Sequence, residues 1–227
     1  MIRRLAALSN MKAVIFDMDG VIVDTEPRHE RAVMQVLEEI GYGDRHGLQF
    51  SDYIGRPDRE LWVDFLSRHQ PAHDINELLA MKRNRVLEII RREQPLFKGL
   101  PELVEKLAAK YKLAVASGSE RQVVQEVLSL KPLRGLFPVV VSIADVTRGK
   151  PAPDLFLRAA ELLGVTTADC WVIEDSKPGV AAALAAGMRV IAITNTYPAE
   201  QLSHATYVAK SYEEIERLLL EPDDCSS

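Results

Sequence analysis

Short apolar runs alternate with helical patterns through the C-terminal two-thirds of the chain, and this alternation is the feature that most constrains the fold. The run at residues 14–16 precedes this region and has the same character. Strand and helix in regular succession predict a parallel sheet flanked by helices, which is an α/β fold. The expected strands are 14–16, 113–116, 139–142, 171–173, 190–193 and 207–209, and the expected helices between them are 101–110, 120–130, 153–163 and 179–186.

Residues 25–93 interrupt the alternation with helical patterns and no convincing strand, and prolines stand near both ends at Pro27 and Pro95. An all-helical insertion after the first strand predicts a small cap domain whose two connections let it open and close. The expected cap helices are 31–40, 59–67 and 75–92, the expected core is 12–24 with 95–220, the expected cap is 25–94, and residues 1–11 and 221–227 are expected to be tails.

Charge and cysteine usage exclude several classes of protein. The formal net charge is −5 without a long basic run, which argues against nucleic acid or a membrane surface as the main partner. No apolar stretch reaches the roughly 18 residues of a transmembrane helix. Cys170 and Cys225 lie far apart without a CxxC spacing, so we expect no disulfide framework or zinc site and a cytoplasmic location. No pattern indicates a large apolar interface, so we expect a monomer.

The first expected strand ends in the sequence Asp17-Met18-Asp19-Gly20. A spacing of two in extended chain places both carboxylates on the same side, where they repel unless a cation lies between them. A carboxylate can attack a phosphoryl group, and Mg²⁺ can bridge carboxylates and phosphate. The second carboxylate can then donate and accept the proton. The alternative is an acidic turn that ends in glycine.

Two further motifs follow the second and third expected strands. Ser117, Gly118 and Ser119 offer a hydroxyl and backbone N–H groups to an anion, although for this motif taken alone a helix N-cap at Ser119 is the favoured interpretation. Lys150 stands between a glycine and a proline, where no helical face requires a lysine. Its ammonium can pair with a phosphate and with Asp17, although a surface lysine remains the alternative.

The fourth motif, Glu174-Asp175-Ser176, again places two acids directly after an apolar run. A capped turn explains Asp175 or Ser176 as the N-cap of the next helix. The functional interpretation makes Asp175 a Mg²⁺ ligand and lets Glu174 assist directly or through water. Because ligands of parallel sheets bind beyond the carboxyl ends of the strands, all four motifs are expected at one edge.

The stretches DMDGVIVDTEP, ASGSE, GKPAPD and VIEDSKPGVAAALAAGM resemble the four signature motifs of the haloacid dehalogenase-like hydrolase superfamily, in its β-phosphoglucomutase-like branch. The resemblance covers roughly residues 12–210. It implies a Rossmann-like core with an inserted helical cap, dependence on Mg²⁺, and phosphoryl transfer through an aspartyl-phosphate.

The resemblance also implies roles for individual residues. Asp17 would be the nucleophile and Asp19 the general acid and base. The metal ligands would be Asp17, the backbone carbonyl of Asp19 and Asp175, with Glu174 in support, and Ser117, Gly118 and Lys150 would hold the phosphate. In the cap, His29 and either Arg56 or Arg59 resemble substrate contacts.

The favoured function is therefore a Mg²⁺-dependent phosphatase of a small phosphorylated metabolite, most simply a sugar phosphate. A β-phosphoglucomutase-like phosphotransferase is the alternative, because both enzymes share these motifs and differ in whether water or a sugar hydroxyl accepts the phosphoryl group. A dehalogenase would leave Asp19, Glu174 and Asp175 without a role. A catalytically idle binding protein has no support, because every chemical position is filled.

Overall fold

The structure is a computed structural model that describes residues 11–53, 57–133 and 135–221. Arg56, Cys225 and nearly all of both expected tails lie outside the described residues. Contacts within the chain divide it into two compact units. The unit called the core here runs to Val23 and resumes at Leu96, and the unit called the cap comprises Asp24–Pro95.

The core contains the predicted parallel sheet, so the α/β prediction is confirmed. All neighbouring strands are parallel, and the order β3-β2-β1-β4-β5-β6 places the first strand in the middle. Phe16 of β1 is in register with Val115 of β2 and with Ile173 of β4, so these three strands end side by side. The strands are β1 (Ala13–Phe16), β2 (Lys112–Ala116), β3 (Val139–Val141), β4 (Cys170–Glu174), β5 (Arg189–Ile193) and β6 (Tyr207–Ala209).

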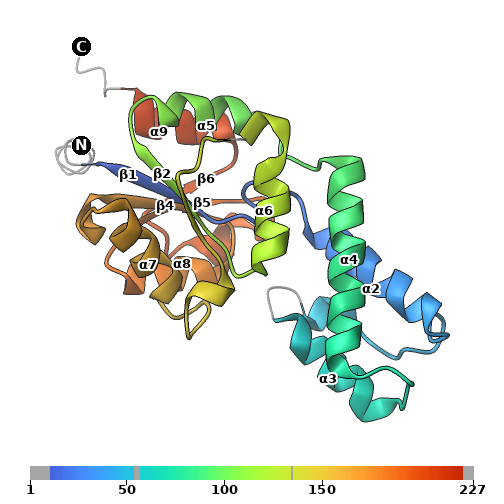
Figure 1. Cartoon of the computed structure of the whole chain (residues 1–227). Coiled ribbons are helices and arrows are strands. Elements are labelled where there is room, and N and C mark those ends of the chain that lie inside the picture. The colour runs from blue at the N-terminus through green and yellow to red at the C-terminus, as the bar shows by residue number, and fades with distance from the viewer. Residues whose placement is uncertain (1–10, 54–56, 134, 222–227) are drawn as a thin grey trace. The chain divides into compact units, whose positions relative to one another are not determined.

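Helices cover both faces of this sheet, which explains why its central strands are apolar on both sides. Figure 1 shows α5 (Leu100–Ala108) and α9 (Tyr212–Leu220) over one face and α7 (Asp154–Leu163) and α8 (Lys177–Ala185) over the other. All four residues of β1 are fully buried. The remaining core helix, α6 (Arg121–Ser129), follows β2.

Side-chain caps explain two of the differences from the expected boundaries. The third strand ends one residue early because the Ser142 side chain and backbone N–H both donate to Asp145 Oδ2, which starts a 3₁₀ turn at Ile143–Asp145. Helix α8 begins early because Ser176 accepts a hydrogen bond from the backbone N–H of Gly179 and acts as its N-cap.

Helix α9 was not expected from the sequence. Its buried residues Tyr212, Ile215 and Leu219 recur at helical spacing, and Ser211 caps its first turn by accepting from the backbone N–H of Glu214. Because α9 has barely more than two turns, its apolar pattern is short and gives a weak signal.

The described residues of the cap form three helices and one 3₁₀ turn, and the prediction of a helical insertion between the first two strands is confirmed. Helix α2 begins five residues earlier than expected because Pro27 lies in its first turn, where no intrahelical N–H is needed. Trp62, Phe65 and Leu78 lie fully buried in the apolar cluster of this unit. The cap elements are α2 (Glu26–Glu39), the turn Phe50–Tyr53, α3 (Asp58–Arg68) and α4 (Ile75–Glu93).

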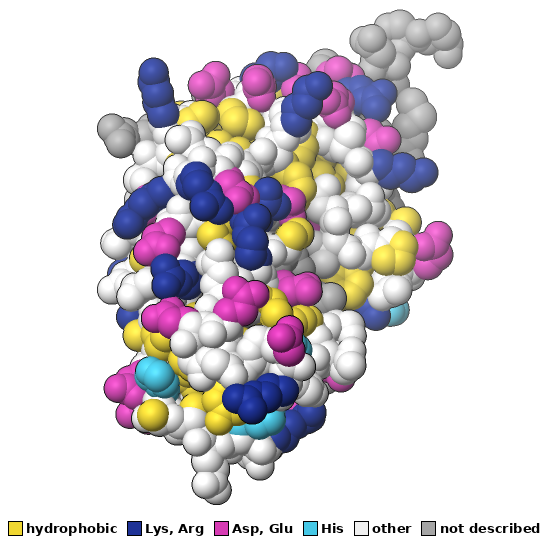
Figure 2. Space-filling model, turned by 90° about the vertical axis from the view of Figure 1, so that its right-hand side faces the viewer, with side chains coloured by type: hydrophobic (Ala, Val, Ile, Leu, Met, Phe, Trp, Pro, Cys, Tyr) yellow, Lys and Arg dark blue, Asp and Glu magenta, His cyan; other side chains and the backbone are white. Residues whose placement is uncertain are grey.

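The surface carries charges of both signs. On the face drawn in Figure 2, lysine and arginine side chains are interspersed with aspartate and glutamate. Within residues 11–53, 57–133 and 135–221, no helix is long and apolar enough to cross a membrane.

Candidate active site

Asp17 lies at the carboxyl end of the central strand β1. Its backbone N–H donates to the carbonyl of Ile173 at 2.9 Å, so Asp17 extends the ladder between β1 and β4 by one residue. This register fixes the direction of its side chain, which is 8% exposed. Asp17 Oδ1 lies 2.6 Å from Lys150 Nζ. The sequence prediction that these two residues meet therefore agrees with the geometry.

Lys150 is enclosed by the site and is not a surface lysine. Its side chain is 12% exposed, and its Nζ lies 2.7 Å from Glu174 Oε1 as well as beside Asp17. The ammonium also lies 5.1 Å from the centre of the Phe156 ring. Burial lowers the pKa of Lys150, but the charges and hydrogen bonds of Asp17 and Glu174 outweigh burial and raise it overall. Lys150 therefore carries a full positive charge between two carboxylates.

Glu174 anchors Lys150 to the loop that follows β4. Its Oε2 accepts hydrogen bonds from the backbone N–H groups of Asp175 and Ser176, both at 2.6 Å, and from Ser176 Oγ at 2.9 Å. The side chain is fully buried. A Cβ on Gly179 would lie 1.5 Å from Glu174 Oε1, so only glycine leaves room for the carboxylate against the first turn of α8.

Asp175 packs against the turn that follows β1. Asp175 is 3% exposed, and its side chain is hydrogen-bonded to Thr196. Gly20 has φ +77°, and a Cβ there would lie 1.9 Å from Asp175 Oδ2. Both the backbone conformation and the contact distance therefore require glycine at position 20.

Asp17, Glu174 and Asp175 form a buried group whose ligand atoms all lie within 4.8 Å of one another, called the acidic group here. Burial is the largest effect on the pKa of Asp17, and together with the charges of Glu174 and Asp19 it raises this pKa to about 7. The charge and hydrogen bond of Lys150 act in the opposite direction and only partly offset the rise. Burial and the neighbouring carboxylates Glu174 and Asp17 also raise the pKa of Asp175.

The acidic group thus holds more negative charge than Lys150 alone offsets. Oxygen ligands of this kind suit a hard divalent cation such as Mg²⁺. Glu174 already accepts four hydrogen bonds, from Lys150, Asp175 and two groups of Ser176. The acidic group could therefore hold a metal ion. Because the oxygens of Glu174 are already engaged, Glu174 is better suited to orienting Lys150 and Asp175 than to binding the metal directly.

Asp19 has different partners from Asp17, although the two are separated by one residue. The chain turns at Met18, whose carbonyl accepts from the backbone N–H groups of Val21, Ile22 and Val23. Asp19 Oδ2 accepts from Ser119 Oγ at 2.7 Å, with Ser117 Oγ at 3.3 Å. Its carboxylate is not part of the acidic group. Coordination of a metal by the Asp19 backbone carbonyl stays a prediction.

The loop after β2 brings Ser117 and Ser119 to this second carboxylate. Ser117 is fully buried, and its Oγ also accepts from the backbone N–H of Ser119 at 3.0 Å. The N-cap interpretation of Ser119 is wrong, because α6 begins at Arg121 with Glu120 in the cap position. Gly118 lies exposed between the two serines, where a Cβ would meet no atom within 4 Å.

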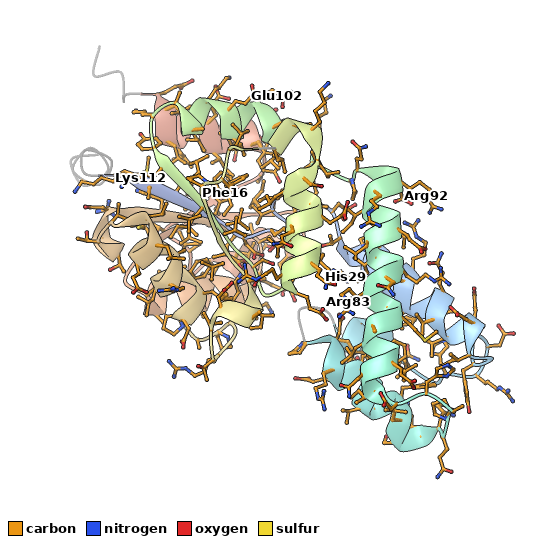
Figure 3. All side chains as sticks on the ribbon, in the orientation of Figure 1. Phe16, His29, Arg83, Arg92, Glu102 and Lys112 are labelled. Atoms are coloured by element: carbon orange, nitrogen blue, oxygen red, sulfur yellow. The ribbon has the colours of Figure 1, made fainter. Side chains whose placement is uncertain are left out.

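In the cap, the structure connects His29 to a residue that sequence reasoning missed. Lys82 of α4 is 2% exposed, and its Nζ lies 2.5 Å from His29 Nδ1 and 2.6 Å from Asp58 Oδ2. Figure 3 labels His29 on α2 and, close to it in that view, Arg83 on α4. Arg59 is exposed in the first turn of α3. The sequence does carry a signal for Lys82, because it is a lysine at the helical spacing of the buried apolar residues of α4.

Residues 14–193 match the haloacid dehalogenase-like hydrolase family. The fructose-1-phosphate phosphatase of Escherichia coli K12 is 34% identical over 180 residues, covering 78% of this chain and 94% of that protein. The phosphorylated carbohydrates phosphatase of Thermotoga maritima is 34% identical over 185 residues, covering 80% and 84% of the two chains.

Two solved structures have the same fold over nearly the whole chain. CbbY from Rhodobacter sphaeroides, crystallised with phosphate, has a TM-score of 0.79 at 25% identity and covers 90% of this chain and 96% of that chain. The structure described as β-phosphoglucomutase-like (a "putative beta-phosphoglucomutase") from Thermotoga maritima has a TM-score of 0.72 at 28% identity and covers 92% and 97%.

Proposed function

The chain belongs to the haloacid dehalogenase-like hydrolase family, and from this premise we propose that it is a Mg²⁺-dependent phosphatase of a small phosphorylated metabolite. The observation that carries the proposal is the buried Asp17 carboxylate, paired with Lys150 at 2.6 Å and grouped with Glu174 and Asp175. A carboxylate so placed is a nucleophile with a fixed direction, and the ammonium beside it attracts a phosphate.

In the first step, a carboxylate oxygen of Asp17 attacks the phosphorus atom and forms an aspartyl-phosphate. The bond between phosphorus and the substrate oxygen breaks, and Asp19 donates its proton to that oxygen. Lys150, Ser117 and Gly118 hold the phosphate oxygens. Mg²⁺ held by Asp17, Asp175 and the Asp19 backbone carbonyl would offset the repulsion between phosphate and carboxylates.

In the second step, water attacks the phosphorus atom and Asp19 accepts its proton. The bond between phosphorus and the Asp17 oxygen breaks, which releases phosphate and restores the carboxylate. Asp19 is suited to both steps because the Ser119 hydroxyl, at 2.7 Å, fixes the carboxylate without engaging it in the acidic group. Proton transfer in both directions by one positioned residue contributes typically 10²–10⁴-fold to the rate.

A sugar phosphate is the substrate class that the relatives support. The two relatives described above are named as phosphatases of fructose 1-phosphate and of phosphorylated carbohydrates, and both exceed 30% identity over most of the chain. In the cap, His29 and either Arg56 or Arg59 are the proposed contacts to the sugar, and the buried Lys82 would hold His29 in position.

A phosphotransferase is the second candidate, because the β-phosphoglucomutase-like structure covers 92% of the chain at 28% identity. In that reaction a sugar hydroxyl, and not water, takes the phosphoryl group from Asp17. The two reactions would use the same catalytic and phosphate-binding residues of the core, and they differ in their products.

Product analysis distinguishes them. The full-length protein is assayed with Mg²⁺ on a panel of sugar phosphates that includes fructose 1-phosphate and β-glucose 1-phosphate, the latter with and without a bisphosphate primer. Free phosphate from several related substrates, lost in EDTA and restored by Mg²⁺, supports the phosphatase. Glucose 6-phosphate that forms without free phosphate contradicts it and supports the phosphotransferase. Activity that is indifferent to EDTA contradicts both.

A further inference from the structure

Two consecutive backbone carbonyls in the turn after Asp19 accept hydrogen bonds from side chains far away in the sequence. The Tyr212 hydroxyl donates to the carbonyl of Val21 at 2.5 Å, and Asn195 Nδ2 donates to the carbonyl of Gly20 at 2.7 Å. Asn195 Nδ2 also lies 3.0 Å from the Tyr212 hydroxyl oxygen, which accepts from it. The two side chains and the two carbonyls therefore form one connected network.

Tyr212 is well suited to holding a backbone carbonyl. It is the first residue of α9, it is 6% exposed, and its ring centre lies 6.2 Å from that of Phe97. Burial is the largest of the effects that raise the pKa of Tyr212, so its hydroxyl stays protonated and able to donate. A phenylalanine would fill the same space and leave the Val21 carbonyl without this donor.

Gly20 connects the network to the acidic group. Its missing Cβ would lie 1.9 Å from Asp175 Oδ2 and 2.8 Å from Thr196 Oγ1, so the turn packs directly on both side chains. Thr196 follows Asn195 in the chain and is hydrogen-bonded to Asp175. A displacement of this turn would therefore change both the packing of Asp175 and the direction of the Asp19 carbonyl, which joins the peptide of Gly20.

We infer that Tyr212 and Asn195 are positioning residues for the metal site. They fix the turn after Asp19 so that its backbone and Asp175 are presented together to a divalent cation. The inference rests on the proposed function, because it requires the acidic group to bind Mg²⁺. Both residues lie outside the four sequence motifs, and they come from the loop after β5 and from α9.

The competing explanation is that Tyr212 only connects α9 to the turn after β1 and so contributes to stability alone. Tyr111 offers a matched control, because its buried hydroxyl donates to the carbonyl of Leu219 at 3.0 Å, near the other end of the same helix. Tyr111→Phe and Tyr212→Phe each remove one buried hydroxyl whose hydrogen bond connects α9 to another part of the core. A tether that acts only through stability would make the two substitutions equivalent.

The test is the dissociation constant of Mg²⁺ from the full-length protein, measured by isothermal titration calorimetry after removal of metal. One net hydrogen bond corresponds to at most about a tenfold change in an equilibrium constant. We expect the constant to rise about three- to tenfold in Tyr212→Phe and in Asn195→Ala, and to stay within about twofold of wild type in Tyr111→Phe. The KM for substrate at saturating Mg²⁺ should change less than the Mg²⁺ constant.

An unchanged Mg²⁺ constant in either Tyr212→Phe or Asn195→Ala overturns the inference, and so does equal weakening in Tyr111→Phe. If Tyr212→Phe fails to fold, the Mg²⁺ constant of Asn195→Ala alone tests the inference, because Asn195 is exposed and its substitution should leave the fold intact. Asp175→Asn separates this outcome from failure of the proposed function. If the wild type binds Mg²⁺, Asp175→Asn abolishes the binding and Tyr212→Phe leaves it intact, only the inference about Tyr212 and Asn195 is overturned. If the wild type binds no Mg²⁺, the inference and the proposed function are both overturned.

Discussion

Gly179→Ala is predicted to destabilise the protein, although alanine is the better helix former. In a helix interior, the exchange of glycine for alanine stabilises by about 0.5–1 kcal/mol. At Gly179 the added Cβ would lie 1.5 Å from Glu174 Oε1 and 1.9 Å from Glu174 Cδ. The new Cβ would overlap the carboxylate of Glu174, which is fully buried and held by hydrogen bonds. Glu174 can therefore move away only at a large cost in free energy.

The size of the effect follows from what Glu174 would lose. Moving its carboxylate breaks at least the contact to Lys150 Nζ at 2.7 Å and weakens the two backbone bonds at 2.6 Å. Each hydrogen bond to a charged group is worth about 1.5–3 kcal/mol. The loss of one such bond and the strain on the others outweigh the helix gain by about 2 kcal/mol or more, which lowers Tm by about 4–8 °C in a protein of this size.

Differential scanning fluorimetry at fixed protein concentration measures this change. Gly118→Ala is the matched control, because a Cβ there meets no atom within 4 Å, and its Tm should stay close to that of wild type. In a Glu174→Ala background the clash is removed, so Gly179→Ala should become neutral or stabilising. A Tm for the single variant Gly179→Ala that equals or exceeds the wild-type value would refute this reasoning.

Three further substitutions test other contacts. Ser119→Ala removes the 2.7 Å hydrogen bond to Asp19 and should lower kcat about tenfold at unchanged Tm; an unchanged kcat would exclude Ser119 from positioning Asp19. Lys150→Met leaves Asp17 and Glu174 buried without their ammonium and should lower phosphate release more than about a hundredfold, so near-normal release would contradict its role. Phe65→Ala should cost about 3–5 kcal/mol and accelerate amide hydrogen exchange within Asp24–Pro95, while equal acceleration in the core would argue against two separate units.

The sheet and the convergence of the motifs could be predicted because they depend on local patterns. Continuous apolar runs such as Val14–Phe16 identify buried parallel strands, and parallel strands place their carboxyl ends at one edge. Asp17 and Lys150, separated by more than half the chain, therefore meet as expected. The order of the strands was not needed for this prediction, because each motif lies in the connection that leaves the carboxyl end of its own strand.

Other features could not be predicted because one sequence pattern fits two structures. A serine before a helix can serve as an N-cap or as a partner of a distant side chain. Ser176 is the N-cap of α8, whereas Ser119 donates to the distant Asp19. The requirement for glycine at position 20 depends on the Asp175 carboxylate from a distant segment, and the requirement at position 179 depends on how the loop after β4 turns Glu174 back against α8, which the residue pattern does not show. The same holds for Tyr212, whose partner Val21 lies at the other end of the chain.

An aspartyl-phosphate on Asp17 can be trapped and located with p-nitrophenyl phosphate as the substrate. Its leaving group needs no proton, so Asp19→Asn should still form the intermediate but fail to hydrolyse it. We expect a burst of one nitrophenolate per Asp19→Asn molecule, with the phosphoryl group found by mass spectrometry on the peptide that contains Asp17. Asp17→Asn should show neither result. Sustained turnover by Asp17→Asn, or a phosphoryl group on another residue, would show that Asp17 is not the nucleophile.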